Sequence, residues 1–319
     1  MRGILIAGIA VVDAIAQYVD DFPSPGGLRF FERLTLTTGG CAVNCAIALA
    51  KLAGGGAECA CDVVCRVGND VLGDFVVAEL ARHGVPSDGV VRDAKASTSF
   101  SFAAIGSSGE RRFLHTTGAN ARLSRADVPP EQLAGRRFMF VAGAMVMDAL
   151  DGAPTAALLA DARQAGAATL LDTVFVEPAA QAEWRRRIGP ALPQVDYFVP
   201  SLPEARAITG ESDPSRMARA LQAGGARNVV IKLGDRGALC REAGGRETLV
   251  PTFRVQRVLD ATGAGDCWCA GFLLGLRDGL PMQEAARLGN AVAAFCIQSP
   301  GATTGVPTLA EVRAYMLQA

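Results

Sequence analysis

The stretch "DATGAGDCWCAGF" runs from Asp260 to Phe272 and joins a glycine-rich turn to an apolar segment. Its glycines let backbone amides turn toward one point, and a helix that begins near Asp266 adds its N-terminal amides and positive dipole end. This arrangement predicts an anion site that suits a phosphate. Helix capping by an aspartate explains the same stretch equally well. The Gly-Lys-Ser/Thr of a P-loop does not follow.

Asp266 is an unexpected residue beside a bound phosphate, because its carboxylate would repel the ligand. The choice makes sense if the carboxylate accepts the proton of a hydroxyl that attacks the phosphate. A second glycine pair, Gly39-Gly40, precedes another helical segment that carries Asn44 one turn inside. Paired glycines permit close approach of a ligand, and an amide that both donates and accepts suits a polyol. The two stretches together predict a cleft with a hydroxyl-rich ligand at one end and a phosphate at the other.

Around these stretches, apolar runs of strand length alternate with helical patterns. Such βαβα alternation predicts an α/β fold, in which a doubly wound, mostly parallel sheet is flanked by helices. The expected strands cover residues 4–12, 62–67, 138–142, 168–172, 197–199 and 229–232. The expected helices cover residues 42–52, 72–83, 154–165, 203–209, 266–276 and 282–298.

Two segments, residues 13–38 and 96–117, break this alternation with hairpin-like patterns. They predict a small β-sheet that forms a lid over the carboxyl ends of the main strands. The remaining ranges, 1–12, 39–95 and 118–319, would form the nucleotide- and substrate-binding body. An antiparallel extension of the main sheet is the alternative to a separate lid.

Composition limits the functional classes. The formal net charge of −1 and the lack of a polybasic run argue against nucleic acid or a membrane surface as a partner. No apolar stretch of about 18 residues predicts a transmembrane helix. The N-terminal apolar run imitates a signal peptide, but a buried first strand explains it better. Nine scattered cysteines without histidines at ligand spacing favour reduced thiols in a cytoplasmic protein over a zinc site.

Seven motifs in order resemble the ribokinase-like (PfkB) family of carbohydrate kinases, and the resemblance covers essentially the whole chain. They are "GGCAVN" (39–44), "VGNDVLGDFVVAELARHGV" (67–85), "GAN" (118–120), "PSLPEARAITG" (200–210), "VVIKLGDRGAL" (229–239), "DATGAGDCWCAGF" (260–272) and "PGATTGVP" (300–307). The resemblance implies an ATP-dependent sugar kinase, a phosphotransferase with an alcohol group as acceptor, that uses Mg²⁺.

The resemblance also implies roles for individual residues. Asp266 would be the general base, and an anion hole would be formed by the amides of Gly263, Ala264, Gly265 and Asp266. Sugar hydroxyls would be bound by Asp13, Gly39, Gly40, Asn44 and Asn120. Asp13 suits this role physically, because a carboxylate accepts two hydroxyl hydrogen bonds, although a turn residue is the alternative.

The nucleotide would contact Lys232, Gly234, Gly237 and Asn290. Glu204 would help to hold Mg²⁺ through water, and Asp260 and Thr262 would hold a monovalent cation such as K⁺, as in some relatives. In the family, the residue that corresponds to Glu204 ends an Asn-x-x-Glu motif. Ser201 stands at the asparagine position of that motif, so a role of Ser201 at the metal is in doubt. A solvated strand-end lysine at 232 and an exposed first-turn acid at 204 are the structural alternatives.

The substrate is less well determined. Cys41, rather than a lysine or arginine, follows the glycine pair and favours an unphosphorylated sugar. Arg111 and Arg112 would suit a sugar acid such as ketodeoxygluconate, or are simply solvated. Lid phenylalanines would stack on a sugar or base, or form a dimer contact, and we expect a homodimer through the lid. The remaining alternatives are a nucleoside kinase and a non-catalytic sugar- or nucleotide-binding regulator.

Overall fold

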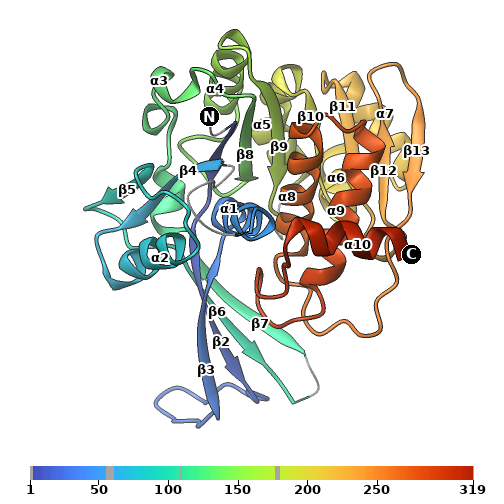
Figure 1. Ribbon diagram of the computed structural model, residues 1–319. Coiled ribbons are helices and arrows are strands. Elements are labelled where there is room, and N and C mark those ends of the chain that lie inside the picture. Colours follow the sequence, from blue (N-terminus) through green and yellow to red (C-terminus); the bar gives the residue numbers. More distant parts are fainter. Residues whose placement is uncertain (1–2, 55–60, 108–109, 177–179, 319) are drawn as a thin grey trace.

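The computed structural model describes residues 3–54, 61–107, 110–176 and 180–318. Its main sheet has nine strands in the order β13-β12-β11-β10-β9-β8-β1-β4-β5 (Figure 1). All neighbours from β11 to β5 pair in parallel, and only the edge pairs β11-β12 and β12-β13 are antiparallel. The strands are β1 (Ile4–Gly8), β4 (Cys61–Gly68), β5 (Val90–Asp93), β8 (Phe138–Ala144), β9 (Ala168–Thr173), β10 (Tyr197–Phe198), β11 (Asn228–Lys232), β12 (Ala238–Arg241) and β13 (Glu247–Val250). The predicted doubly wound, mostly parallel sheet is confirmed, whereas the edge hairpin β12-β13 was not predicted.

Helices cover both faces of this sheet, as its alternating side chains require. Ile4 and Ile6 of β1 enter one hydrophobic core, and Leu5 and Ala7 enter the other. The first core is closed by α1 (Cys41–Leu52), α2 (Val71–Arg82), α8 (Ala264–Arg277), α9 (Met282–Cys296) and α10 (Leu309–Gln318). The second is closed by α4 (Ala153–Gln164), α5 (Gln181–Ile188), α6 (Leu202–Thr209) and α7 (Pro214–Ala223). Within the described ranges, no helix is long and apolar enough to cross a membrane.

A separate sheet projects from the body (bottom of Figure 1). It has four strands in the order β3-β2-β6-β7, namely β2 (Val11–Gln17), β3 (Arg33–Gly39), β6 (Phe100–Ile105) and β7 (Arg111–Thr116). Each of the two predicted hairpins is present, and β2 joins them by pairing in parallel with β6. The small sheet is therefore independent of the main sheet and does not extend it.

The prediction of one strand over residues 4–12 was wrong, because the chain changes sheets in the middle of that run. β1 ends at Gly8 in the main sheet, and β2 begins at Val11 in the small one. Between them, the side chain of Asn120 donates to the Ala10 carbonyl and accepts from the Ala10 amide, both at 3.0 Å. Since the residues on either side of the break stay buried, hydrophobicity does not mark the change of sheet.

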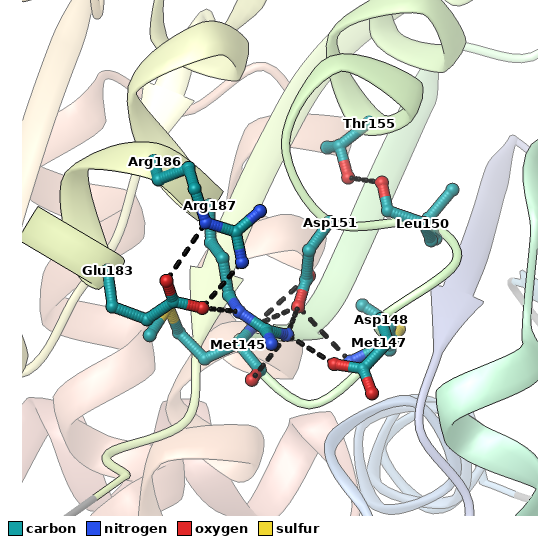
Figure 2. Close-up of polar contacts among 9 residues, drawn as sticks. All are labelled: Met145, Met147, Asp148, Leu150, Asp151, Thr155, Glu183, Arg186 and Arg187. Atoms are coloured by element: carbon teal, nitrogen blue, oxygen red, sulfur yellow. Dashed lines mark hydrogen bonds and ion pairs between the residues drawn. The ribbon is translucent and has the colours of Figure 1, made fainter. Parts of the chain in front are cut away.

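The segment after β8 is fixed by a buried ionic cluster, which Figure 2 shows. Met145 has a φ of 101°, an uncommon angle for a residue with a side chain. Its amide and that of Met147 donate to the carboxylate of Asp151. Arg187, on α5, forms a 3.0 Å ion pair with the same carboxylate. Burial raises the pKa of Asp151 to about 6, although these hydrogen bonds oppose the shift. The cluster therefore holds the end of β8 in a strained conformation that neighbouring charges stabilise.

Candidate active site

Asp13 lies on β2 of the small sheet and faces other acids. Burial raises the pKa of its carboxyl to about 6, a hydrogen bond from Ser101 lowers it, and the nearby charges of Asp266 and Asp260 raise it further. These influences show that Asp13 lies near two acids, Asp260 and Asp266, that are far from it in the sequence. The sugar-binding role predicted for Asp13 is thus matched by a position beside the predicted base.

The glycine pair that follows β3 leaves room for this arrangement. A Cβ atom at Gly39 would lie 2.2 Å from Oδ2 of Asp13, so any side chain there would displace the carboxylate. Gly40 has a φ of 86°, and a Cβ atom there would lie 2.5 Å from the carbonyl oxygen of Ile9. Glycine is therefore needed at both positions for steric reasons, one to seat Asp13 and the other to let α1 start against the β1-β2 junction.

Asn44 and Asp266 meet across the site. The Nδ2 atom of Asn44, on α1, donates to Oδ2 of Asp266, on α8, at 2.8 Å across 222 positions of sequence. The Oδ1 atom of Asn44 is buried without a hydrogen-bond partner. Such an orphaned acceptor carries a desolvation cost that a substrate hydroxyl would relieve.

The carboxyl group of Asp266 has a raised pKa. Burial raises its pKa above the usual value, while hydrogen bonds from Asn44 and Cys41 act in the opposite direction. Asp266 lies in the first turn of α8, where helical amides lack intrahelical partners. A carboxylate with a raised pKa is a stronger base than an ordinary one, and this one is held at a helix N-terminus.

The residues predicted to form an anion hole lie at the start of α8. Gly263 caps the helix at φ 74°, and a Cβ atom there would lie 2.5 Å from Cβ of Ala302. Ala302 belongs to residues 300–307, which are called the closing loop below. The close approach of this loop therefore requires glycine at position 263. The amide of Gly265 belongs to the first turn. The amide of Ala264 instead donates to the Ala261 carbonyl at 3.3 Å, so it already has a partner.

Lys232 ends β11 beside this helix start, and a Cβ atom at Gly265 would lie 3.5 Å from its Nζ. Its ammonium group forms a 2.7 Å ion pair with Asp172 at the end of β9. Burial acts to lower the pKa of Lys232, but the charges of Asp172 and other neighbours outweigh it, and the net shift is upward. Lys232 is thus a fully charged group next to the predicted anion hole, and the alternative of a solvated strand-end lysine is wrong.

Glu204 and Ser201 form a capping box at the start of α6. The Ser201 amide donates to the Glu204 carboxylate at 2.6 Å, and the Ser201 side chain accepts from the Glu204 backbone. Burial and the charge of Asp172 raise the pKa of Glu204, while Lys232 lowers it. The alternative of an exposed first-turn acid is therefore wrong, since only 7% of Glu204 is exposed. Serine in place of the family's asparagine has a local explanation, because its hydroxyl caps the helix.

Asp260 and Thr262 lie where the turn before α8 meets the closing loop. The carboxylate of Asp260 accepts from the amides of Thr262 and Gly301, each at 2.9 Å. Lys51 of α1 ties the same loop by donating to the carbonyls of Thr303 and Thr304. Among the residues that the structure describes, no group of three or more His, Cys, Asp or Glu side chains could hold a metal ion directly.

The two remaining asparagines of the predicted site have structural contacts. Asn120 clamps Ala10, three residues before Asp13, and is 1% exposed. Asn290 accepts from Nε1 of Trp268 at 2.8 Å and donates to the carbonyls of Val250 and Pro251. Both amides are turned into the protein, so direct ligand contacts of these side chains are not supported.

The glycines of the predicted nucleotide loop follow Lys232. Gly234 has a φ of 64°, with no atom within 4 Å of an added Cβ, so its surroundings are open. Gly237 has a φ of 89°, and a Cβ atom there would lie 2.0 Å from the carbonyl oxygen of Val250. Glycine is therefore needed at position 234 for its backbone angle. At position 237 it is needed for its backbone angle and for the close approach of the backbone at Val250.

Sequence reasoning missed Asp172, Ser101 and His115. Asp172 lies near the end of the buried strand β9, so a search for acids at strand ends would have found it. Ser101 and His115 carried no such signal, because their importance depends on their pairing beside Asp13.

Comparison with known proteins places this geometry in a family. Residues 1–309 match the model of the pfkB family carbohydrate kinases. The 2-dehydro-3-deoxygluconokinase of Bacillus subtilis is 30% identical over 260 residues, 79% of each chain. Fructokinase-1 of Zea mays is 30% identical over 326 residues, which cover 97% of this chain and 98% of that relative.

A solved structure of Arabidopsis thaliana ribokinase, complexed with ribose and ATP, has the same fold. Its TM-score is 0.84 at 22% identity, and the match covers 98% of both chains. The chain therefore belongs to the pfkB family of carbohydrate kinases, which are phosphotransferases that act on an alcohol group.

Proposed function

We propose that the protein transfers the γ-phosphate of ATP to a hydroxyl of a free sugar or sugar acid, with Asp266 as the general base. The observation that carries the proposal is the 2.8 Å contact between Asn44 and Asp266, which joins the predicted sugar end to the phosphoryl end. Asp266 would take the proton of the attacking hydroxyl, and the first-turn amides of α8 would stabilise the charge on the transferred group. Asp13 would hold other hydroxyls of the sugar.

ATP and Mg²⁺ are the cofactors that the donor set suits. The ammonium group of Lys232, beside Gly265, would contact phosphate oxygens, and Gly234 and Gly237 would let the nucleotide approach the backbone. Glu204 is held by its capping box, and would bind Mg²⁺ through water rather than directly. Bound Mg²⁺ would neutralise charge on the phosphates.

A monovalent cation such as K⁺ is proposed at the turn of Asp260 and Thr262. The buried carboxylate of Asp260 fixes that turn to the closing loop. Activity should then fall when K⁺ is replaced by tetramethylammonium, a cation too large for such a turn. Equal rates in the two salts would exclude the cation site.

The small sheet is proposed to act as a lid, with residues 13–38 and 96–117 moving against a body formed by the rest of the chain. We further propose that the lid forms a homodimer and that the protein works in the cytoplasm. The cytoplasmic location is supported by eight cysteines without disulfides in the described part of the chain.

Asp266→Asn tests the base. With a good sugar substrate, ADP release measured by a coupled assay should fall by about a thousandfold or more, because general-base and nucleophile activation are lost together. Asp278→Asn, at the other end of the same helix, is the matched control and should keep full activity. Full activity in Asp266→Asn would overturn the assignment, and turnover of nucleosides alone would show a nucleoside kinase instead.

A further inference from the structure

Four polar side chains form one row across the lid. Asp13 on β2 pairs with Thr37 on β3 and with Ser101 on β6, and Ser101 pairs with His115 on β7. Residues directly opposite one another in neighbouring strands share a face of the sheet. Thr37, Asp13, Ser101 and His115 therefore lie side by side on one face, and are called the Asp13 row below.

The Asp13 row borders the substrate end of the site. Asp13 itself is close enough to Asp266 and Asp260 for their charges to affect its titration. At the other side of the row, a Cβ atom added to Gly301 of the closing loop would lie 3.8 Å from Oγ1 of Thr37. The face that carries the row is therefore turned toward the body and toward Asp266, the proposed base.

The hydrogen-bonding groups at this end are mainly acceptors. Asp13 and Asp266 are carboxylates, and Oδ1 of Asn44 is a buried acceptor without a partner. The Oγ atom of Ser101 is hydrogen-bonded both to Asp13 and to Nδ1 of His115, the latter at 2.9 Å. An acceptor-rich site needs a ligand that brings donors, and hydroxyl groups are donors whereas a carboxylate or phosphate only accepts.

Charge leads to the same conclusion, because the Asp13 row contains no lysine or arginine. Arg112 pairs with Ala104 and lies on the opposite face of the lid, where it donates to the Asp20 carbonyl. Position 111 pairs with Ile105 four residues along the strand, so its backbone is about 13 Å from the row. Lys232 is already paired with Asp172.

We propose that the substrate is a neutral polyhydroxy compound whose adjacent hydroxyls face the Asp13 row, and that this row discriminates against sugar acids and sugar phosphates. The proposal rests on the kinase function proposed above and narrows it. It separates this chain from its relative the 2-dehydro-3-deoxygluconokinase, whose name denotes a sugar acid. Ser101 and His115 are assigned as specificity-determining residues.

A panel of matched substrates tests the proposal through kcat/KM from coupled ADP release. The neutral members are ribose, fructose and adenosine, and the anionic members are ribose 5-phosphate, fructose 6-phosphate and 2-dehydro-3-deoxygluconate. The best neutral substrate should exceed every anionic one by about a hundredfold, since an unpaired charge beside carboxylates is strongly rejected. A preferred anionic substrate would overturn this inference while leaving the kinase function intact. No turnover of any member would overturn the kinase function and the inference together.

Two substitutions on neighbouring residues of β7 locate the discrimination. His115→Arg places a cation in the Asp13 row and should raise the anionic-to-neutral ratio of kcat/KM by about tenfold or more. Thr116→Arg places the same cation on the opposite face and should leave the ratio unchanged. Equal ratios in both variants and the wild type would contradict the assignment.

A smaller substitution keeps the test independent of the arginine variants. Ser101→Ala removes the hydroxyl that contacts Asp13, and should raise KM for the neutral substrate by about tenfold with little change in kcat. The KM for ATP should stay the same, because Ser101 acts only at the sugar end. An unchanged sugar KM would count against the row.

Discussion

At the scale of single residues, the site is built from acids that cost stability. Asp13 and Asp266 are both partly buried, and desolvation raises the pKa of each. Glycine at position 39 leaves room for the carboxylate of Asp13, which any side chain at that position would displace. The chain therefore keeps close negative charges that only a substrate or a proton would relieve, which is typical of a functional site.

Asp13→Asn should stabilise the protein in a pH-dependent way. The pKa of Asp13 is about 6 in the folded protein and 3.8 for an ordinary aspartate, so ionised Asp13 destabilises the fold fully above pH 6 and not at all below pH 3.8. The substitution should therefore raise the free energy of unfolding by up to roughly 3 kcal/mol at pH 8 and far less at pH 4.5. Urea denaturation at the two pH values measures this. An equal gain at both would show that the charge is not the cause. Sugar binding should be weakened in the same variant.

Gly39→Ala should damage sugar binding before it damages folding. The new methyl group would displace the Asp13 carboxylate, so KM for the sugar should rise by about tenfold or more. Unfolding should become easier by about 1–3 kcal/mol because the site is overpacked. Steady-state kinetics and thermal unfolding check both effects. Gly244→Ala is the control, since a Cβ atom there meets nothing within 4 Å. A normal sugar KM in Gly39→Ala would contradict the geometry.

At the scale of elements, α8 connects the catalytic residue to the core. Its first turn carries Asp266. Further along the helix, the buried ring of Trp268 stacks on that of Phe272, with ring centroids 4.8 Å apart. Asn290 of α9 joins Trp268 to the end of β13 and the residue after it through three hydrogen bonds. The position of the base thus depends on contacts that face away from the ligand.

Asn290→Leu should act on stability rather than on nucleotide affinity. The substitution keeps the volume but leaves the indole N–H of Trp268 and the carbonyls of Val250 and Pro251 buried without partners. We expect a loss of roughly 2–4 kcal/mol in the free energy of unfolding, measured by denaturant titration. The KM for ATP should change less than twofold, relative to the exposed control Asn69→Leu. A large rise in that KM with normal stability would restore the nucleotide role.

At the scale of the whole molecule, the lid has two different faces. The Asp13 row faces the body, and the next row, shifted by one residue, contains Leu36, Ala14, Phe102 and Leu114. Leu36 is 46% exposed and Leu114 is 63% exposed, which leaves a solvent-facing apolar strip on the sheet. Strips of this kind favour association, so the same sheet would serve the substrate on one face and a second copy on the other.

Leu36→Glu should weaken the proposed dimer. A charge placed in the apolar row would be buried without a partner at the interface, which is strongly unfavourable. Sedimentation velocity at micromolar concentration should show a dimer for the wild type and a monomer for the variant. Leu249→Glu, at an exposed position on β13, is the control and should remain a dimer. A monomeric wild type would refute dimerisation through the lid.

Much of the fold was predictable because the relevant signals are local. Apolar periodicity and turn residues identified most of the main strands and helices, and the two hairpins of the lid. The glycine pair before α1 and the two glycines at the start of α8 indicated both ends of the candidate site, because close approach to a backbone requires glycine. The break at Ala10 escaped notice, since both strands around it are buried and no change in hydrophobicity separates them.

The sequence by itself determined the α/β body and the family and indicated Asp266 as the candidate base, because these depend on residue type and spacing along the chain. Only the tertiary structure decided which side chains meet. Asn44 reaches Asp266 across 222 positions, Asp172 pairs with Lys232, and Asn120 turns away from the ligand to hold Ala10. These contacts arise from strand register and helix packing between distant segments. No local sequence pattern predicts these contacts, because the partners are close in space only after the chain has folded.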